Sequence, residues 1–401
     1  MLNFQFTPKE QELANEFNKF FAEQITEEKW DRTMDEQGCN NPYWEDLHRA
    51  MANRGYYALM APKEIGGRGL SFTEWTLYLE SIGLHRGPFG NINAVLNTSN
   101  FLLGGMLIWA TNEQKRHWIP KFISGEVKSC QGLTEPGCGA DLAAVELRAV
   151  EQPDGNYVLN GTKIFNNAHN ATHILTVSRT DPSVAKHKGI SLFLVDLKSP
   201  GMSVSPSYIS TGGEKRSEVA FVDVAVPKEN LLGEKNKGWY AISQAMRFER
   251  TQGLRIGEMQ EQLDRLVKAV KELTYDGKPV AKIPWVRYAL AQMATEIRVV
   301  IQMCWWVAYL QDHDIDVTRH EAPLTKVFRT ELQDRFAHVA IEILGEYGGL
   351  EKWNKSRDGV PTHALASEWY LDSRKEQIGA GPTEVQLNIV AERGFGLPRL
   401  Y

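Results

Sequence analysis

The spacing of apolar residues changes twice along this chain of 401 residues. From residue 1 to about 122, apolar residues recur at the three- and four-residue spacing of amphipathic helices. From about 123 to 236 they gather in short β-rich runs between turn residues. From about 237 to the end the helical spacing returns. The pattern predicts three domains, 1–122, 123–236 and 237–401, in a mostly helical α+β fold.

The first helix has a well-defined predicted start. Thr7-Pro8 followed by Glu10 combines an N-cap, a proline in the first turn and an early acid. The apolar residues that follow at helical spacing are Leu13, Phe17, Phe20 and Phe21. Further along, the Gly-rich segment 65–69 predicts a loop that interrupts the N-terminal helices.

Short β-rich runs fill the middle region, bounded by turn pairs such as Asp154-Gly155 and Asn160-Gly161. The runs are 157–159, 174–177, 190–197 and 219–226. Because turns and not helices separate them, we expect an antiparallel sheet or a small barrel, and not a parallel α/β unit.

Three long helical stretches, 239–272, 284–312 and 322–345, follow the strands. Antiparallel helices of this length usually pack as a bundle. The expected architecture is therefore an N-terminal helical domain, a middle antiparallel β domain and a C-terminal four-helix bundle. Trp305-Trp306 falls inside the second stretch, and we interpret the pair as bundle packing.

Composition narrows the classes of function. A net charge of -5 gives no basic field for nucleic acid. The longest apolar stretch, 299–310, is interrupted by Gln302 and is too short for a membrane span. The four cysteines lack CxxC spacing, and His169 and His173 lie in a turn-and-strand region, so we expect no metal site and a reducing compartment. The N-terminus resembles neither a secretory signal nor a transit peptide, which predicts a cytoplasmic location.

The segment from Gly132 to Asp141 is the most specific in the chain. It is rich in backbone amides and poor in side-chain bulk, and Gly137 and Gly139 permit close approach. Such a loop can present N–H groups to an anion or to the polar edge of a ring. Taken alone, it could equally be a surface turn.

The string Leu-Thr-Glu-Pro-Gly-Cys-Gly-Ala-Asp over 133–141 resembles the signature of the acyl-CoA dehydrogenase family, whose usual form ends in Gly-Ser-Asp. Further segments resemble family motifs in the family's order: 62–69, 122–126, 160–163, 221–227, 383–386 and 391–393. The resemblance therefore spans nearly the whole chain.

The resemblance implies FAD, held mainly between the β domain and the C-terminal bundle and completed by a neighbouring subunit. By motif position, the residues expected at the cofactor are Leu133, Thr134, Gly139, Ala140, Phe165, Asn166, Asn167, Gly345, Gly349 and Thr383. Ala140 replaces a frequent serine, and Phe165 a frequent tryptophan. Leu273 stands where the family has an arginine that reaches a neighbour's FAD, so one charge-assisted contact is lost.

The catalytic base must be a carboxylate that takes a proton α to a thioester. Many family members carry it where this chain has Ala380. Isovaleryl-type members place it on the first long helix after the β domain, before an arginine, where this chain has Glu249-Arg250. Glu249 also lies on the predicted buried stripe of that helix and has no cationic residue at i±3 or i±4. We predict Glu249 and Arg250 as catalytic residues; a structural carboxylate is the alternative, and Glu384 is a weaker candidate.

The predicted reaction is dehydrogenation of an acyl-CoA thioester to the trans-2-enoyl-CoA. Gly379, Ala380 and Gly381 remove side-chain volume near the expected substrate, which favours a bulky, branched or cyclic acyl group. The resemblance implies an electron-transfer flavoprotein as acceptor and a homo- or hetero-tetramer built as a dimer of dimers. Two alternatives stay open: a flavin oxidase or monooxygenase of the same fold, and a base- or FAD-impaired partner subunit of a heteromeric enzyme. The reductase direction also stays open.

Overall fold

The computed structural model describes residues 5–26, 42–85, 92–208, 215–249, 253–351 and 359–399. The chain divides into two compact units. The bundle unit comprises Met1–Gln37, Ser71–Pro88 and Arg250–Tyr401, and the sheet unit comprises Gly38–Leu70 and Phe89–Glu249. The N-terminal helices are thus shared between the two units. Within the described ranges, no helix combines the length and the apolar character that a membrane crossing needs.

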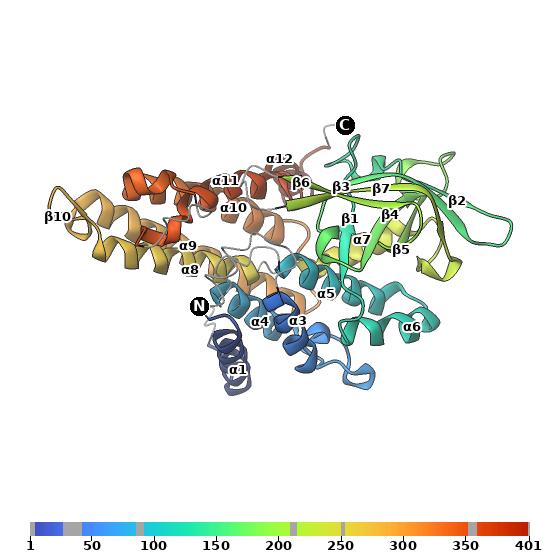
Figure 1. Cartoon of the computed structure of the whole chain (residues 1–401), viewed down its shortest axis with the longest axis horizontal. Coiled ribbons are helices and arrows are strands. Elements are labelled where there is room, and N and C mark those ends of the chain that lie inside the picture. Colours follow the sequence, from blue (N-terminus) through green and yellow to red (C-terminus); the bar gives the residue numbers. More distant parts are fainter. Residues whose placement is uncertain are drawn as a thin grey trace. The chain divides into compact units, whose positions relative to one another are not determined.

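Helices dominate the bundle unit. They are α1 (Pro8–Gln24), α4 (Phe72–His85), α8 (Gly253–Glu272), α9 (Pro284–Asp312), α10 (Glu321–Leu344), α11 (Ala366–Ile378) and α12 (Thr383–Ile389). Figure 1 shows α8, α9, α10 and α11 running side by side, as expected of a C-terminal bundle. A short hairpin, β9 (Thr274–Tyr275) and β10 (Lys278–Pro279), follows α8.

The predicted start of α1 is confirmed. The Thr7 hydroxyl accepts a hydrogen bond from the Glu10 N–H (3.2 Å), and the Glu10 carboxylate accepts one from the Thr7 N–H (2.7 Å). This reciprocal capping box satisfies two N–H groups that the helix itself leaves without acceptors. The four predicted apolar residues of the helix are buried. One of them, Phe17, packs edge-to-face on Tyr78 of α4, with ring centroids 5.4 Å apart.

The last residue of α9 caps the N-terminus of α4. The Asp312 carboxylate accepts hydrogen bonds from the N–H groups of Phe72 (2.6 Å) and Thr73 (2.9 Å), residues distant in sequence. A carboxylate at a helix N-terminus satisfies unpaired N–H groups and interacts favourably with the helix dipole. The predicted stretch 284–312 matches α9, and 322–345 matches α10 to within a residue.

The sheet unit places an eight-stranded sheet next to helices α3 (Pro42–Asn53), α5 (Ile92–Trp109), α6 (Asn112–Ile123) and α7 (Gly238–Ala245). Its strands are β1 (Ser129–Gly132), β2 (Arg148–Glu151), β3 (Tyr157–Asn166), β4 (His173–Arg179), β5 (Ile190–Asp196), β6 (Met202–Tyr208), β7 (Lys215–Val226) and β8 (Leu231–Leu232).

The strand order is β6-β7-β3-β2-β4-β5-β8, with β1 paired to β4. Most neighbours are antiparallel, as predicted, and all four predicted runs form strands. The pairs β1–β4 and β2–β4 are parallel, which the sequence pattern did not predict. Alternation of apolar and polar residues places a strand in a sheet but does not reveal the direction of its neighbour.

The prediction of one continuous helical stretch over 239–272 is wrong. The chain forms α7 and then a 3₁₀ turn η7 (Met246–Glu249), while α8 spans Gly253–Glu272 and 250–252 lie outside the described residues. Glu249 therefore lies at the end of a 3₁₀ turn and not on the face of a long α-helix.

Candidate active site

The segment 133–141 is an anchored loop on the sheet unit. The Ile164 N–H of β3 donates to the Thr134 carbonyl (2.9 Å), and an isolated bridge between Glu135 and Cys138 closes the turn. Leu133 and Thr134 are half-buried. The outer part of the loop, including Gly139 and Ala140, is exposed. The loop is therefore fixed to the sheet through its first half and open along its second.

A buried ion pair fixes the first half of this loop. Lys163 Nζ lies 2.6 Å from Glu135 Oε1, with side-chain exposures of 0% and 6%. Lys163 also donates to the Leu133 carbonyl (3.1 Å). The Glu135 carboxylate accepts from the N–H groups of Glu146 (2.7 Å) and Leu147 (3.0 Å). Burial lowers the pKa of Lys163, and the charge of Glu135 opposes that shift.

Phe165 presents its ring outward from a strained position. It has a φ of 59° and is 60% exposed. The pairing of β3 with β7 is irregular between Lys163 and Asn166, on either side of it. A large side chain at positive φ is a genuine outlier, and such strain gathers at functional sites. The sheet thus displays an aromatic ring beside the amide-rich loop.

The two neighbouring asparagines bond within the protein. Asn166 is buried; its side chain donates to the Lys163 carbonyl (3.3 Å) and accepts from the Ala168 N–H (3.2 Å). The Asn167 side chain accepts a hydrogen bond from Arg216 of β7. These contacts stabilise the bulge that carries Phe165. The exposed ring and the loop fit the predicted isoalloxazine group, which needs an apolar cover and N–H donors at its polar edge.

On the bundle unit, α11 and α12 are joined by an unusual turn. Gly379 and Ala380 are exposed, and φ is positive at both Ala380 (54°) and Gly381 (89°). The hydroxyl of Thr383, the first residue of α12, is buried and has no hydrogen-bond partner among the described residues. An orphaned buried hydroxyl calls for an explanation such as a bound group. The polar group of a cofactor or substrate would satisfy it.

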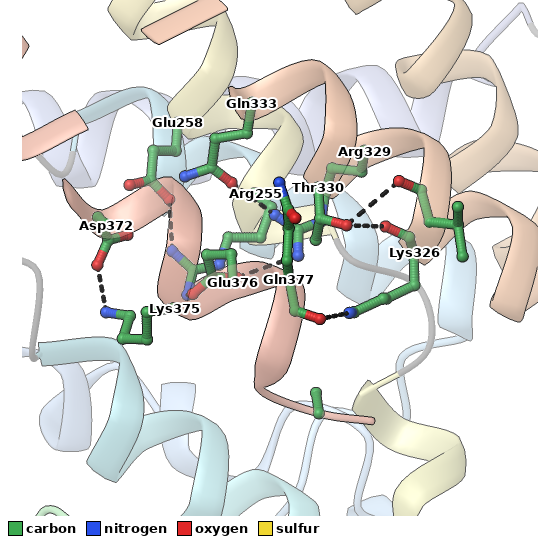
Figure 2. Close-up of polar contacts among 12 residues, drawn as sticks. Arg255, Glu258, Lys326, Arg329, Thr330, Gln333, Asp372, Lys375, Glu376 and Gln377 are labelled. Carbon is green, nitrogen blue, oxygen red and sulfur yellow. Dashed lines mark hydrogen bonds and ion pairs between the residues drawn. The ribbon is translucent and has the colours of Figure 1, made fainter. Parts of the chain in front are cut away.

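Glu376 lies four residues before Ala380, which stands at the usual base position. Its carboxylate lies 2.7 Å from the Arg255 guanidinium of α8 and 3.1 Å from that of Arg329 of α10 (Figure 2). Burial alone would raise the pKa of Glu376, but the two arginines outweigh it and hold the pKa well below its usual range. A carboxylate held in this way accepts a proton poorly, so Glu376 does not replace the missing base.

Glu249 ends the η7 turn of the sheet unit. The preceding Phe248 is buried and packs against α5, where a Cβ on Gly104 would lie 2.6–2.7 Å from three atoms of the ring. A Cβ on the next residue, Gly105, would lie 2.7 Å from the Cβ of Ala245, the last residue of α7. Because Gly104 and Gly105 have no side chains, they leave a notch on α5 into which Ala245 and Phe248 fit. The Glu249 side chain and all of Arg250 lie outside the described residues.

The predicted residues at the end of α10 have intramolecular neighbours. Gly345 follows the last residue of α10, and a Cβ there would lie 3.1 Å from the Tyr275 hydroxyl. That hydroxyl donates to the Ile343 carbonyl (3.0 Å), which joins the β9–β10 hairpin to the helix end. Gly349 is exposed at the end of the short 3₁₀ turn η9 (Gly345–Gly349).

Sequence reasoning missed two charged residues at these sites. Lys163 stood inside a recognised motif, and its position two residues before Phe165 was the available signal. Glu376 gave no signal, because its partners are remote in the sequence. Elsewhere in the bundle unit, burial raises the pKa of Glu80 on α4 to about 7, with Arg298 opposing the rise. A carboxylate that titrates near neutrality is a rival base that any test of Glu249 must include.

Comparison with known proteins places these features in a family. Models of the N-terminal, middle and C-terminal domains of acyl-CoA dehydrogenases match residues 7–126, 130–224 and 236–395. The chain is 30% identical over 401 residues to acyl-CoA dehydrogenase FadE29 of Mycobacterium tuberculosis (strain ATCC 25618 / H37Rv), covering 98% of each chain. It is 31% identical over 348 residues to the mitochondrial short-chain specific acyl-CoA dehydrogenase of Rattus norvegicus, covering 86% of this chain and 81% of the relative.

A solved structure described as "Tcur3481-Tcur3483 steroid ACAD" superposes with a TM-score of 0.87. Its sequence is 27% identical, and the match covers 99% of this chain and 100% of the other. The three matched domains, in this order and over this length, agree with the helix–sheet–helix fold and with the anchored loop described above. The chain therefore belongs to the acyl-CoA dehydrogenase family, FAD-dependent oxidoreductases that act on CH–CH bonds.

Proposed function

We propose that this enzyme converts a bulky, branched or cyclic acyl-CoA to its trans-2-enoyl-CoA, with Glu249 as the base. The observation that carries the proposal is the α11–α12 turn. Ala380 occupies the usual base position and cannot accept a proton, while Glu376 nearby is held by Arg255 and Arg329. Of the two base positions that the family uses, only that of Glu249 retains a carboxylate in this chain.

In this mechanism Glu249 removes the α proton of the thioester. The Ala380 backbone N–H donates to the thioester carbonyl and stabilises the negative charge that develops there. By motif position, Leu133, Thr134 and Thr383 would hold the flavin, and the Phe165 ring would cover it and exclude water. Gly139 and Ala140 would offer backbone N–H groups to its phosphates. Bound FAD supplies the chemistry that the side chains lack, acceptance of a hydride from Cβ.

The proposed size of the acyl group is supported by the small side chains at the α11–α12 turn. Gly379 and Ala380 are exposed and carry together a single methyl group, so no large side chain rises from this backbone. The related structure whose description names a steroid agrees with a large ring system. The relative named for short chains does not, so substrate size is the point to test.

The test is an anaerobic titration of the purified flavoprotein with acyl-CoAs of graded bulk, followed by the loss of flavin absorbance. We expect a cyclic or branched acyl-CoA to bleach the flavin at lower concentration than butyryl-CoA. In Ala380→Leu, which restores side-chain volume, this preference should shrink. Ready bleaching by short straight chains alone would contradict the proposed substrate class.

A second candidate is a subunit that works only with a partner. Ala140, Leu273 and Ala380 each depart from the family pattern at a residue of cofactor or base, and the description of the related steroid structure joins two protein names. The flavin content per chain discriminates. We expect about one FAD per chain in a homotetramer that reduces on adding substrate; half that content or less, rescued by a second chain, would favour the heteromer.

Reduced flavin must then be reoxidised. We propose an electron-transfer flavoprotein as the acceptor, in keeping with the family. The measurement is reoxidation of the substrate-reduced enzyme in air, which we expect to be slow compared with turnover. Reoxidation by oxygen at the turnover rate would instead favour the oxidase alternative.

A further inference from the structure

Lys326 of α10 is a buried cation close to the α11–α12 turn. It is 4% exposed, and its Nζ donates to the Gln377 carbonyl at 3.0 Å (Figure 2). Gln377 lies in the last turn of α11, where carbonyl groups have no N–H donor within the helix. Lys326 therefore supplies from a neighbouring helix the bond that the end of α11 lacks.

The residue before Gln377 is fixed just as firmly. Glu376 binds Arg255 and Arg329, and these arginines in turn bind Glu258 (2.8 Å) and Gln333 (2.9 Å) (Figure 2). Ion pairs buried in this way contribute little net stability compared with well-packed apolar side chains, because desolvation of the charges is costly. What they do supply is a fixed geometry. These ion pairs fix the last turn of α11 against α8 and α10.

C-terminal to these contacts, the backbone of the α11–α12 turn is strained. Ala380 has a φ of 54°, which costs about 1–2 kcal/mol for a residue with a Cβ. From α12, the Gln386 side chain donates weakly to the Ala380 carbonyl (3.4 Å). The Ala380 N–H has no acceptor within the described part of the chain. The turn is thus held from both sides, and one amide at its tip is left available.

We propose that Lys326, together with the Arg255–Glu376–Arg329 ion triad, is a positioning residue for the Ala380 N–H that binds the thioester carbonyl. The inference rests on the proposed function for the identity of the bound group. Lys326 fixes Gln377 and the triad fixes Glu376, so only the five residues 378–382 lie between these fixed positions and α12. The role resembles that of a second layer of contacts behind a metal or an oxyanion hole, where the supporting group never touches the substrate.

The experiment measures the C=O stretching frequency of the bound thioester. Acyl-CoA labelled with ¹³C at the thioester carbonyl is bound to the flavoprotein, and the C=O stretch is read by difference infrared spectroscopy against the unlabelled compound. An N–H donor lowers this frequency. We expect a lowered frequency in the parent protein, a shift back toward the free value in Lys326→Met, and a kcat/KM about tenfold lower. Lys326→Arg, which keeps a cationic donor, should restore most of both.

Lys268→Met, on an exposed position of α8, is the matched control and should keep the parent frequency. If Lys326→Met does not fold, Lys326→Gln serves, since its neutral side chain is too short to span the same distance. A parent-like frequency in the folded variant would overturn the inference, as would a parent frequency equal to that of free acyl-CoA. Neither outcome bears on the base, because flavin reduction by Glu249→Gln tests that separately.

Discussion

Phe165 and Ala380 are both non-glycine residues at positive φ, and both are exposed. Neither conformation has a local cause in the sequence. Paired charges lie two residues before the first and four before the second: Lys163 with Glu135 near Phe165, and Glu376 with its two arginines near Ala380. Buried ion pairs beside strained backbone indicate sites whose geometry matters more than their contribution to stability.

Removing one member of the Lys163–Glu135 pair should be costly. In Lys163→Met the Glu135 carboxylate is left buried without its cation, so we expect a loss of about 3–5 kcal/mol in the free energy of unfolding. FAD affinity should fall at least tenfold, because Leu133 and Thr134 lose their support. Urea unfolding and FAD titration measure the two effects.

The matched control is the double variant Glu135→Gln/Lys163→Met, which removes both charges. It should recover much of the stability, because no unpaired charge remains. A single variant as stable as the parent, with unchanged FAD affinity, would show that the pair does not hold the loop.

Among the elements of the fold, the candidate site residues lie mainly at helix ends and in turns, and not in the middle of helices. The site residues lie on the loop after β1, at the bulge of β3, at the end of η7 and between α11 and α12. The regular elements position these segments through close approach, as where Phe248 meets Gly104, and through caps, as where Lys326 meets Gln377.

The notch on α5 should control the position of Glu249. In Gly104→Ala the new methyl group would meet the Phe248 ring at less than 3 Å, so the η7 turn must shift. We expect the rate of flavin reduction to fall about tenfold while FAD content stays at the parent level, a size of effect that small misplacements of a catalytic group produce. Ser243→Ala, on the exposed side of α7, should react at the parent rate. Unchanged reduction in Gly104→Ala would mean that the notch does not position the base.

Lys326 gives the stability a pH dependence of known sign. Burial, followed by repulsion from Arg329, lowers the pKa of Lys326 from its ordinary value of 10.5 to about 8, with Glu376 and Glu384 opposing. Between these two pH values the unfolded chain binds the proton and the folded chain does not, so stability rises with pH in that window. Below pH 8 the cost of burying the charge is fully present. Urea unfolding at pH 7.5 and 9.5 should show a rise in the parent that is smaller in Lys326→Met; equal rises would contradict the shift.

At the scale of the whole molecule, local signals predicted the elements well. The capping residues of α1, the length of α9 and the strand runs of the middle region follow from turn residues and apolar spacing, which act within a few positions. The motif over 133–141 located the loop that the structure anchors to β3. These predictions needed no information about distant partners.

What could not be predicted depends on residues far apart in sequence. Arg255 and Glu376 are separated by 121 positions, and Lys326 and Gln377 by 51. No spacing rule links such pairs before the helices are packed. The parallel pairing of β1 and β2 with β4 is non-local in the same way. The break at η7 was missed because apolar spacing continues across it, and the seat of Phe248 on Gly104 becomes visible only in the fold.

Single-turnover reduction of the flavin under anaerobic conditions tests whether Glu249 is the base. The parent is compared with Glu249→Gln, and with Glu80→Gln and Glu384→Gln as matched controls for the other carboxylates. A general base contributes about 10²–10⁴-fold, so Glu249→Gln should slow reduction by roughly that factor with FAD still bound. Both controls should keep the parent rate. Parent-like reduction in Glu249→Gln, or loss of reduction in Glu80→Gln alone, would rule out Glu249 as the base.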